Sequence, residues 1–235
     1  AHVHEAELLL VGGCMKERPI IMGAESVRAI LEGRKTQSRR VINPQPKFIG
    51  APNVPFKTDD TNSKGIINCP YGRVGDRLWV RETWKPGAWR NDGRVAIDYM
   101  ASPELTHTPW AYMGEQASRF IHKWLAEVEK SGLVPNEQGR YEWEPGKSPL
   151  KWKSPMFMPR WASRITLEIT DVRVERLQDI TEEDARAEGT TSPLRYVGAL
   201  RHKYKHLWDK LNAKRGYPWE SNPWVWVVSF KVGKV

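Results

Sequence analysis

The chain has 235 residues, which suits one domain or one domain with a large insertion, and its 37 Lys and Arg against 28 Asp and Glu give a formal net charge of +9. Its two Cys form no Cys-x-x-Cys pair, so we expect no metal, no cofactor and a reducing, cytoplasmic setting. No stretch approaches the roughly 20 consecutive apolar residues of a membrane span, so we expect no membrane partner.

Residues 1–14 are expected to be an extension upstream of the domain, with Met15 as an alternative start. The segment Leu8-Leu9-Leu10-Val11-Gly12-Gly13-Cys14 is faintly similar to a lipoprotein cleavage site. No basic segment precedes it, however, and its apolar run is shorter than the roughly 7–15 residues of a signal core. We therefore expect a single domain over 15–235.

A short amphipathic helix is predicted to begin at Ser26 as N-cap and to end at Gly33, with Val27, Ile30 and Leu31 on its apolar face. After it comes Gly33-Arg34-Lys35-Thr36-Gln37-Ser38-Arg39-Arg40, which holds four cations, two hydroxyls and one amide. A strand is expected at 41–42, before the prolines that follow. The basic cluster should therefore lie at a helix-to-strand junction, where donors converge on an anion.

Two interpretations of this cluster remain open. Lys35 precedes Ser38 by three residues, and a lysine beside a serine can act as a base–nucleophile pair. Alternatively the cluster is a solvated run of charge, as most such runs are.

Strands are predicted over 77–81, 165–174 and 224–230. Ile165, Leu167 and Ile169 alternate in one phase, whereas Val172 and Val174 alternate in the other. A one-residue slip of this kind predicts a bulge near residues 170–171. Short helices between such strands favour an α+β fold built on a small curled sheet or barrel.

Residues 85–160 are rich in Trp, Pro and Gly and show no sheet periodicity, so we expect an insertion of loops around one helix over 117–128. A further helix is predicted from the helical spacing of the apolar residues Tyr204, Leu207, Trp208 and Leu211. This helix carries His202 and His206, four residues apart as two zinc ligands would be, but no third ligand is evident. Its many Lys and Arg could instead follow a nucleic-acid backbone.

The segment Thr181-Glu182-Glu183-Asp184-Ala185-Arg186-Ala187-Glu188-Gly189 has the signature of a capped helix, with Thr181 as cap and Asp184 three residues later. Glu188 falls in the last turn, where the helix dipole disfavours negative charge. It is either one more surface carboxylate or an acid that is kept there for a role.

The chain contains twelve Trp, several of them beside a cation, as in Trp79-Val80-Arg81 and Arg160-Trp161. Aromatic faces next to cations suit the stacking of unpaired bases and contact with their phosphates, so Arg81, Arg160 and Trp161 are candidate binding residues. The alternative is that these Trp fill the core, which we expect of about two thirds of them.

Four motifs together resemble the ASCH domain, a family of the PUA-like superfamily of small β-barrels. They are the Gly33–Arg40 segment, Gly75-Asp76, the segment from Thr181 to Gly189, and Trp226-Val227-Val228-Ser229-Phe230. Met158-Pro159-Arg160-Trp161-Ala162-Ser163-Arg164 and Asn222-Pro223-Trp224-Val225-Trp226 are similar to a branch encoded by phages and prophages. The resemblance implies a PUA-like barrel with flanking helices, in which 85–160 is a Trp-rich insertion.

This resemblance implies binding of RNA or of a modified nucleoside. One type of ASCH protein is an amidohydrolase that removes the acetyl group of N4-acetylcytidine, using a Lys, a Thr and a Glu. In this chain these positions are Lys35, Ser38 in place of the Thr, and Glu188, and the Arg that follows in the motif is Arg40. Arg34 and Arg39 of the same basic cluster are further candidate binding residues. Other members resemble ribonucleases, and a reader that binds RNA or modified bases without chemistry is the alternative.

Overall fold

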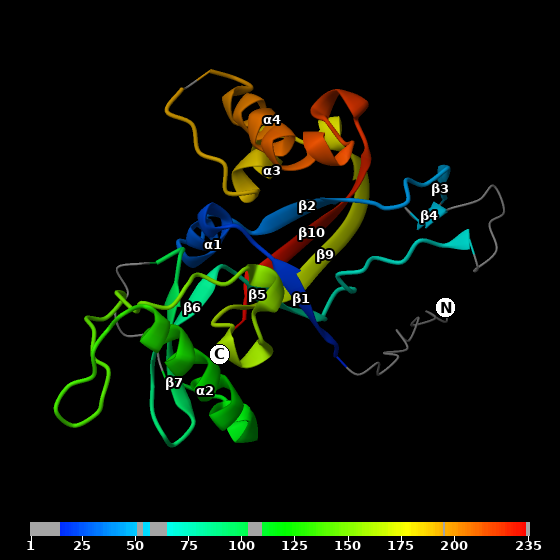
Figure 1. Ribbon diagram of the computed structural model, residues 1–235. Coiled ribbons are helices and arrows are strands. Elements are labelled where there is room, and N and C mark those ends of the chain that lie inside the picture. The colour runs from blue at the N-terminus through cyan, green and yellow to red at the C-terminus, as the bar shows by residue number, and fades with distance from the viewer. Residues whose placement is uncertain (1–14, 51–53, 57–64, 103–109, 195, 234–235) are drawn as a thin grey trace, which may run out of the picture.

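The computed structural model describes residues 15–50, 54–56, 65–102, 110–194 and 196–233 (Figure 1). The expected extension at 1–14 lies outside these residues. The helices are α1 (Ala24–Leu31), α2 (Ala117–Lys130), α3 (Glu182–Ala187) and α4 (Ala199–Asn212). The strands are β1 (Glu17–Ile21), β2 (Gln37–Val41), β3 (Phe48–Gly50), β4 (Val54–Phe56), β5 (Arg77–Arg81), β6 (Trp84–Trp89), β7 (Arg94–Tyr99), β8 (Ala111–Tyr112), β9 (Thr166–Arg176) and β10 (Trp224–Val232). The α+β class is confirmed.

The main sheet has five strands in the order β1-β5-β9-β10-β2. β1 runs parallel to β5, and the other neighbours are antiparallel. β1 and β2 are the edge strands, and no pairing joins them among the described residues, so the sheet is open and the expected barrel closure is not confirmed. In Figure 1, α3 and α4 lie together on one side of the long β2, β10 and β9 strands, whereas α2, β6 and β7 lie at the other end.

The predicted slip in β9 is a β-bulge. Ser229 pairs with Asp171, but the next residue of β10, Phe230, pairs with Ile169. Thr170 is therefore the extra residue. It lets Leu167, Ile169 and Val174 all reach the core although their spacing breaks the two-residue period.

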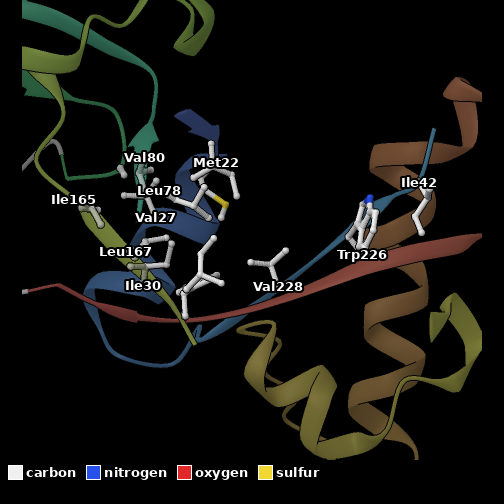
Figure 2. Close-up of a cluster of buried hydrophobic side chains, with 14 of the residues drawn as sticks. Met22, Val27, Ile30, Ile42, Leu78, Val80, Ile165, Leu167, Trp226 and Val228 are labelled. Carbon is white, nitrogen blue, oxygen red and sulfur yellow. The ribbon is translucent and has the colours of Figure 1, made fainter. Parts of the chain in front are cut away.

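The core of the main sheet is a cluster of buried aliphatic and aromatic side chains (Figure 2). Figure 2 shows Leu78 and Ile165 gathered with Val27 and Ile30 of α1, while Trp226 lies farther along β10. Trp226 is 6% exposed. A smaller cluster joins α3 and α4 to the opposite face of β10 through Ala185, Tyr204, Trp208, Val225 and Val227. β10 is thus buried on both sides, as its sequence predicts.

The start of α1 differs from the prediction. Its N-cap is Gly23, and Ser26 lies inside the helix. Gly23 offers no side-chain oxygen for the first backbone N–H groups, so the pattern of apolar residues and not a capping side chain sets where this helix begins. Its end agrees with the prediction, because Gly33 adopts φ +72°, which a residue with a Cβ rarely does.

The insertion has its own sheet and its own core, which the sequence did not predict. β6, β7 and β8 form a three-stranded antiparallel sheet against α2. A bulge between Pro86 and Ala88 interrupts the alternation of side chains along β6. The two-residue period of a strand is therefore not visible in this part of the sequence. Buried side chains fill this second core: Trp84, Val95, Ile97, Tyr99, Met113, Trp124, Val128, Leu150, Met158 and Ala162.

Most of the Trp side chains take part in packing. Trp84, Trp124, Trp208, Trp219 and Trp226 are buried; Trp79, Trp89, Trp143, Trp161 and Trp224 are half-buried; Trp110 and Trp152 are exposed. Core packing therefore accounts for more of them than surface stacking does. Among the described residues, no helix is long and apolar enough to span a membrane.

Candidate functional site

The basic cluster lies partly in the turn after α1 and partly in β2. The backbone N–H groups of Arg34 and Lys35 both donate to Ala29 O, at 2.8 and 2.9 Å, which closes the end of α1. β2 begins at Gln37, four residues earlier than expected. Ser38 and Arg39 are therefore strand residues, and the predicted junction is shorter than eight residues. Side chains along β2 alternate between the two faces of the sheet.

The end of α3 is pressed against this turn. Thr181 and Asp184 form the predicted capping box at the other end of the helix. Thr36 N–H donates to Ala187 O at 2.8 Å, and an isolated antiparallel bridge joins Lys35 to Glu188. Gly189 follows with φ +84°, and a Cβ there would lie 2.9 Å from Ala29 Cβ and 3.0 Å from Lys35 Cβ. Only glycine allows this close approach.

Lys35 and Glu188 form a buried ion pair. Lys35 Nζ lies 2.5 Å from Glu188 Oε2 and also donates to the Glu188 backbone oxygen at 2.9 Å. The second carboxylate oxygen, Oε1, accepts from the Arg39 backbone N–H and from Tyr204 Oη, the latter at 3.4 Å. The Lys35 and Glu188 side chains are 4% and 5% exposed. The carboxylate that sequence placed at an unfavourable helix end therefore has a cation and two further donors.

Burial lowers the pKa of Lys35 below its usual value, because a buried ammonium loses its hydration. The charge of Glu188 opposes this shift, while Arg40 and Arg39 add to it. Burial also raises the pKa of Tyr204 well above its usual value, and the Glu188 charge raises it further. Tyr204 therefore stays protonated and can only donate to Glu188.

A pocket of about 310 Å³ lies beside this ion pair, and we call it the Lys35 pocket. Lys35, Ser38, Arg40 and Glu188 line it, together with Tyr204 and its neighbours on α4. The remaining lining residues are Ile21, Met22, Gly23, Ser26, Arg39, Val41, Tyr71, Leu207, Trp208, Leu211, Asn212 and Arg215. The three predicted catalytic residues thus share one pocket.

Arg40 crosses the open side of the main sheet. Its Nη2 donates to Ile21 O on the opposite edge strand at 2.7 Å, and its Nε donates to Ser38 Oγ at 3.2 Å. The Tyr71 ring lies 5.8 Å from the guanidinium. Within the described part of the chain, Arg40 is the one side-chain partner of the Ser38 hydroxyl, which makes no hydrogen bond to Lys35 or Glu188.

The Arg39 guanidinium is a structural group. Its side chain is fully buried, and its Nη2 lies 3.0 Å from both Glu175 Oε2 and Asp184 Oδ2. Gln37 Oε1 accepts from its Nη1. With these partners the guanidinium ties β2 to β9 and α3. Arg39 is predicted to bind the ligand, but in this arrangement its guanidinium offers no accessible donor; only the buried Nε lacks a hydrogen-bond partner among the described residues.

Three predicted binding residues lie away from the Lys35 pocket, near the insertion. Arg81 Nε donates to Met158 O at 3.1 Å, and Arg160 forms a two-pronged ion pair with Glu17 at 2.9 and 3.2 Å. Trp161 is half-buried in the second core. Arg81 and Arg160 therefore hold residues 156–161 against β5 and β1 of the main sheet, whereas Trp161 packs against Trp84 and Phe120 of the insertion.

Basic side chains gather in a groove next to the Lys35 pocket. This α1–α4 groove has a volume of about 490 Å³, and Ser26, Glu188 and Leu207 line both cavities. Its basic residues are Arg28, Arg34, Lys203, His206 and Lys210. Two of its three carboxylates are already paired, Glu32 with Arg34 at 2.5 Å and Glu188 with Lys35. The groove therefore keeps an excess of positive charge.

Sequence reasoning missed two residues of the pocket. Tyr204 was assigned to an apolar helix face, although a tyrosine there signals a hydroxyl that needs a partner. Tyr71 carries no local signal. The histidine pair lies with ring centroids 4.7 Å apart, and the described residues contain no group of three or more His, Cys, Asp or Glu side chains that could hold a metal ion.

Comparison of the chain with protein-family models, with curated proteins and with solved structures found no match.

Proposed function

We propose that this chain is a PUA-like ASCH protein whose Lys35 pocket binds a nucleoside of RNA and hydrolyses an acyl amide on its base. One observation carries the proposal. Lys35 and Glu188, 153 positions apart, are held as a buried ion pair beside a pocket that also contains Ser38. Burying a charged pair costs free energy, so a pair that faces a cavity is a candidate for chemistry.

The size and charge of the cavities suit a nucleoside with flanking phosphates. A volume of about 310 Å³ lies at the small end of ligand pockets. Arg40 and the Tyr71 ring offer a donor and a flat face to a base. The adjoining α1–α4 groove supplies cations for phosphates on either side. A strand of RNA is therefore a better fit than an uncharged small molecule.

The proposed chemistry uses the proton that Lys35 and Glu188 share. With this proton on Glu188, neutral Lys35 accepts the proton of Ser38 Oγ, directly or through one water. The serine oxygen forms a bond to the acyl carbon, the carbon–nitrogen bond breaks, and Glu188 protonates the leaving amine. Water then hydrolyses the serine ester and releases the carboxylic acid. The Ser38 hydroxyl must first turn from Arg40 towards Lys35.

The alternative is a reader that binds without chemistry. The hydrogen bond from Arg40 Nε to Ser38 Oγ favours it, because this bond directs the hydroxyl to a cation and not to a base. In this reading Arg40 and Ser38 bind a phosphate or a carbonyl oxygen, and the Lys35–Glu188 pair only shapes the pocket.

The experiment that separates the two is turnover of N4-acetylcytidine, free and within a short RNA. If the three residues act as one unit, Lys35→Ala, Ser38→Ala and Glu188→Gln each remove most turnover, and double variants are little worse than single ones. Ser163→Ala is the matched control, since its hydroxyl bonds to Val80 O outside the pocket. If the wild type binds acylated nucleosides tightly but turns over none of them, the catalytic proposal is wrong and the non-catalytic binding protein remains.

Binding itself is tested by salt. Affinity for single-stranded RNA should fall as salt rises, with a slope of about 0.7 for each phosphate that is neutralised. Lys203→Gln and Lys210→Gln should each flatten this slope, because both side chains line the groove. Exposed Lys147, which is paired with Glu144 on the insertion, is the control position. If RNA affinity does not depend on salt, the proposed binding of phosphates in the α1–α4 groove is wrong.

A further inference from the structure

A second cavity of about 820 Å³ lies in the insertion, and we call it the insertion pocket. It is formed by the end of β6 with the turn that follows, one face of α2, and the segment 139–143. None of its lining residues lines the Lys35 pocket or the α1–α4 groove. The function proposed above makes no use of it.

Aromatic rings in fixed positions form its walls. Trp89 packs against Trp143 and Trp124, with ring centroids 5.5 and 5.6 Å apart. The Trp143 indole N–H donates to Gly87 O at 2.6 Å, which holds this ring in place. Tyr141 is half-buried beside them. Ile121 and Leu125 of α2 add aliphatic surface.

The polar residues that line the pocket are Arg90 and Arg140, together with Asn91 and Glu142. Arg90 and Arg140 are both exposed, and neither guanidinium has a carboxylate partner among the residues the structure describes. Arg90 lies 4.4 Å from the Trp110 ring centroid. Asn136 accepts from the Arg140 backbone N–H at 2.9 Å and donates to Glu142 at 2.8 Å.

Hydrogen bonds that join Asn136 to Arg140 and Glu142 hold the loop that carries Arg140. Of the described residues, Glu142 is the one carboxylate that lines the pocket, and it accepts a hydrogen bond from the Asn136 amide. Within the described part of the chain, neither Arg90 nor Arg140 has a carboxylate partner, and two such guanidinium groups disfavour a cationic ligand such as a quaternary ammonium, although aromatic walls alone would suit one. They favour a ligand that is flat and anionic.

We propose that the insertion pocket binds a nucleotide, with its base between the aromatic walls and its phosphate on Arg140. Every nucleobase has a π face that stacks on aromatic rings, and Arg pairs with phosphate through two parallel hydrogen bonds. A free mononucleotide and one unit of a single strand offer the same chemistry. The proposal does not depend on the function of the Lys35 pocket.

The test is calorimetric titration of the full chain with adenosine 5′-monophosphate, adenosine, ribose 5-phosphate and single-stranded octaadenylate. The monophosphate should bind saturably, adenosine more weakly, and ribose 5-phosphate not measurably. Tyr141→Ala should weaken the monophosphate by about tenfold, as the loss of one stacking partner does, and Tyr141→Phe should restore it. Arg140→Gln should lower the affinity for the monophosphate to that for adenosine and leave the affinity for adenosine unchanged.

Arg94→Gln is the control, because Arg94 is exposed and paired with Asp92 on the same hairpin outside the pocket. If octaadenylate binds far more tightly than the monophosphate and competes with it, the natural ligand is a strand; comparable affinities indicate a free nucleotide. Absence of binding by both overturns the proposal. So does binding that neither Tyr141→Ala nor Arg140→Gln weakens, since the ligand would then lie elsewhere. Turnover of N4-acetylcytidine by these variants reports separately on the Lys35 pocket.

Discussion

Each half of the molecule buries a lysine beside a carboxylate, and the two pairs are built differently. Lys35 and Glu188 lie 2.5 Å apart, and both oxygens of the carboxylate have donors. Lys85 and Asp98 in the insertion lie 3.8 Å apart, and Asp98 Oδ2 has no hydrogen-bond partner.

The other contacts of the two lysines differ in the same way. Lys85 donates to Ser148 O at 2.6 Å and lies 5.0 Å from the Trp152 ring centroid, so it ties a loop to β6. Lys35 instead lines a pocket. The comparison teaches that a buried ion pair by itself does not mark a site. What distinguishes the first pair is a full set of donors together with a cavity beside it.

Removal of Glu188 should have the largest effect on stability. Glu188→Ala leaves the Lys35 ammonium buried without its counter-charge, which costs about 3–5 kcal/mol in the free energy of unfolding. Denaturant titration measures this. The double variant Lys35→Met/Glu188→Ala should recover a large part of the loss, because no uncompensated charge remains. A double variant that is less stable than Glu188→Ala contradicts this account.

Removal of Asp98 should cost less. In Asp98→Ala the Lys85 ammonium keeps Ser148 O and the face of Trp152, so we expect a loss of about 1–3 kcal/mol. The same denaturant titration gives the value. If Asp98→Ala destabilises the chain as strongly as Glu188→Ala, the two pairs are equivalent and the comparison fails.

The cap of α3 contributes to the placement of Glu188. Thr181→Ala removes the side-chain acceptor of the Asp184 backbone N–H and should cost about 1 kcal/mol. Thr181→Ser retains the acceptor and should be close to wild type. Thermal unfolding measures both. A larger effect on turnover or binding at the Lys35 pocket than on stability would show that the cap also positions Glu188.

The smallest expected effect is on the pH dependence of stability. Burial raises the pKa of Asp98 above its unfolded value, and the charge of Lys85 opposes this only in part. The native state therefore binds the proton of the Asp98 carboxyl more tightly than the unfolded state does. The stabilisation that this proton provides falls as the pH rises from the unfolded pKa, about 3.9, through the higher native pKa. Asp98→Asn should flatten the curve of unfolding free energy in that window. An unchanged curve means that the Asp98 pKa is not raised.

Local pattern predicted those elements whose side chains alternate or repeat without interruption. β5, β10, α2 and α4 appear where expected, and the bulge at Thr170 follows from two alternations in opposite phase. β6 was missed because Pro86 and Gly87 fall within it. A bulge places successive side chains on faces that the two-residue period does not anticipate. β7 was missed although Val95, Ile97 and Tyr99 alternate with less buried residues, because the Pro, Gly and Trp content of residues 85–160 favoured loops.

By itself the sequence singled out Lys35, Ser38 and Glu188, through a basic motif, a resemblance and an acid at an unfavourable helix end. Only the tertiary structure decided that Lys35 and Glu188 touch, because the contact spans 153 positions and requires Gly189 to fit against α1. It also decided that Ser38 faces Arg40, that Tyr204 joins the site, and that Arg39 is enclosed by carboxylates. Sequence pattern reports the face on which a side chain lies, whereas its partners come from segments whose packing no local period encodes.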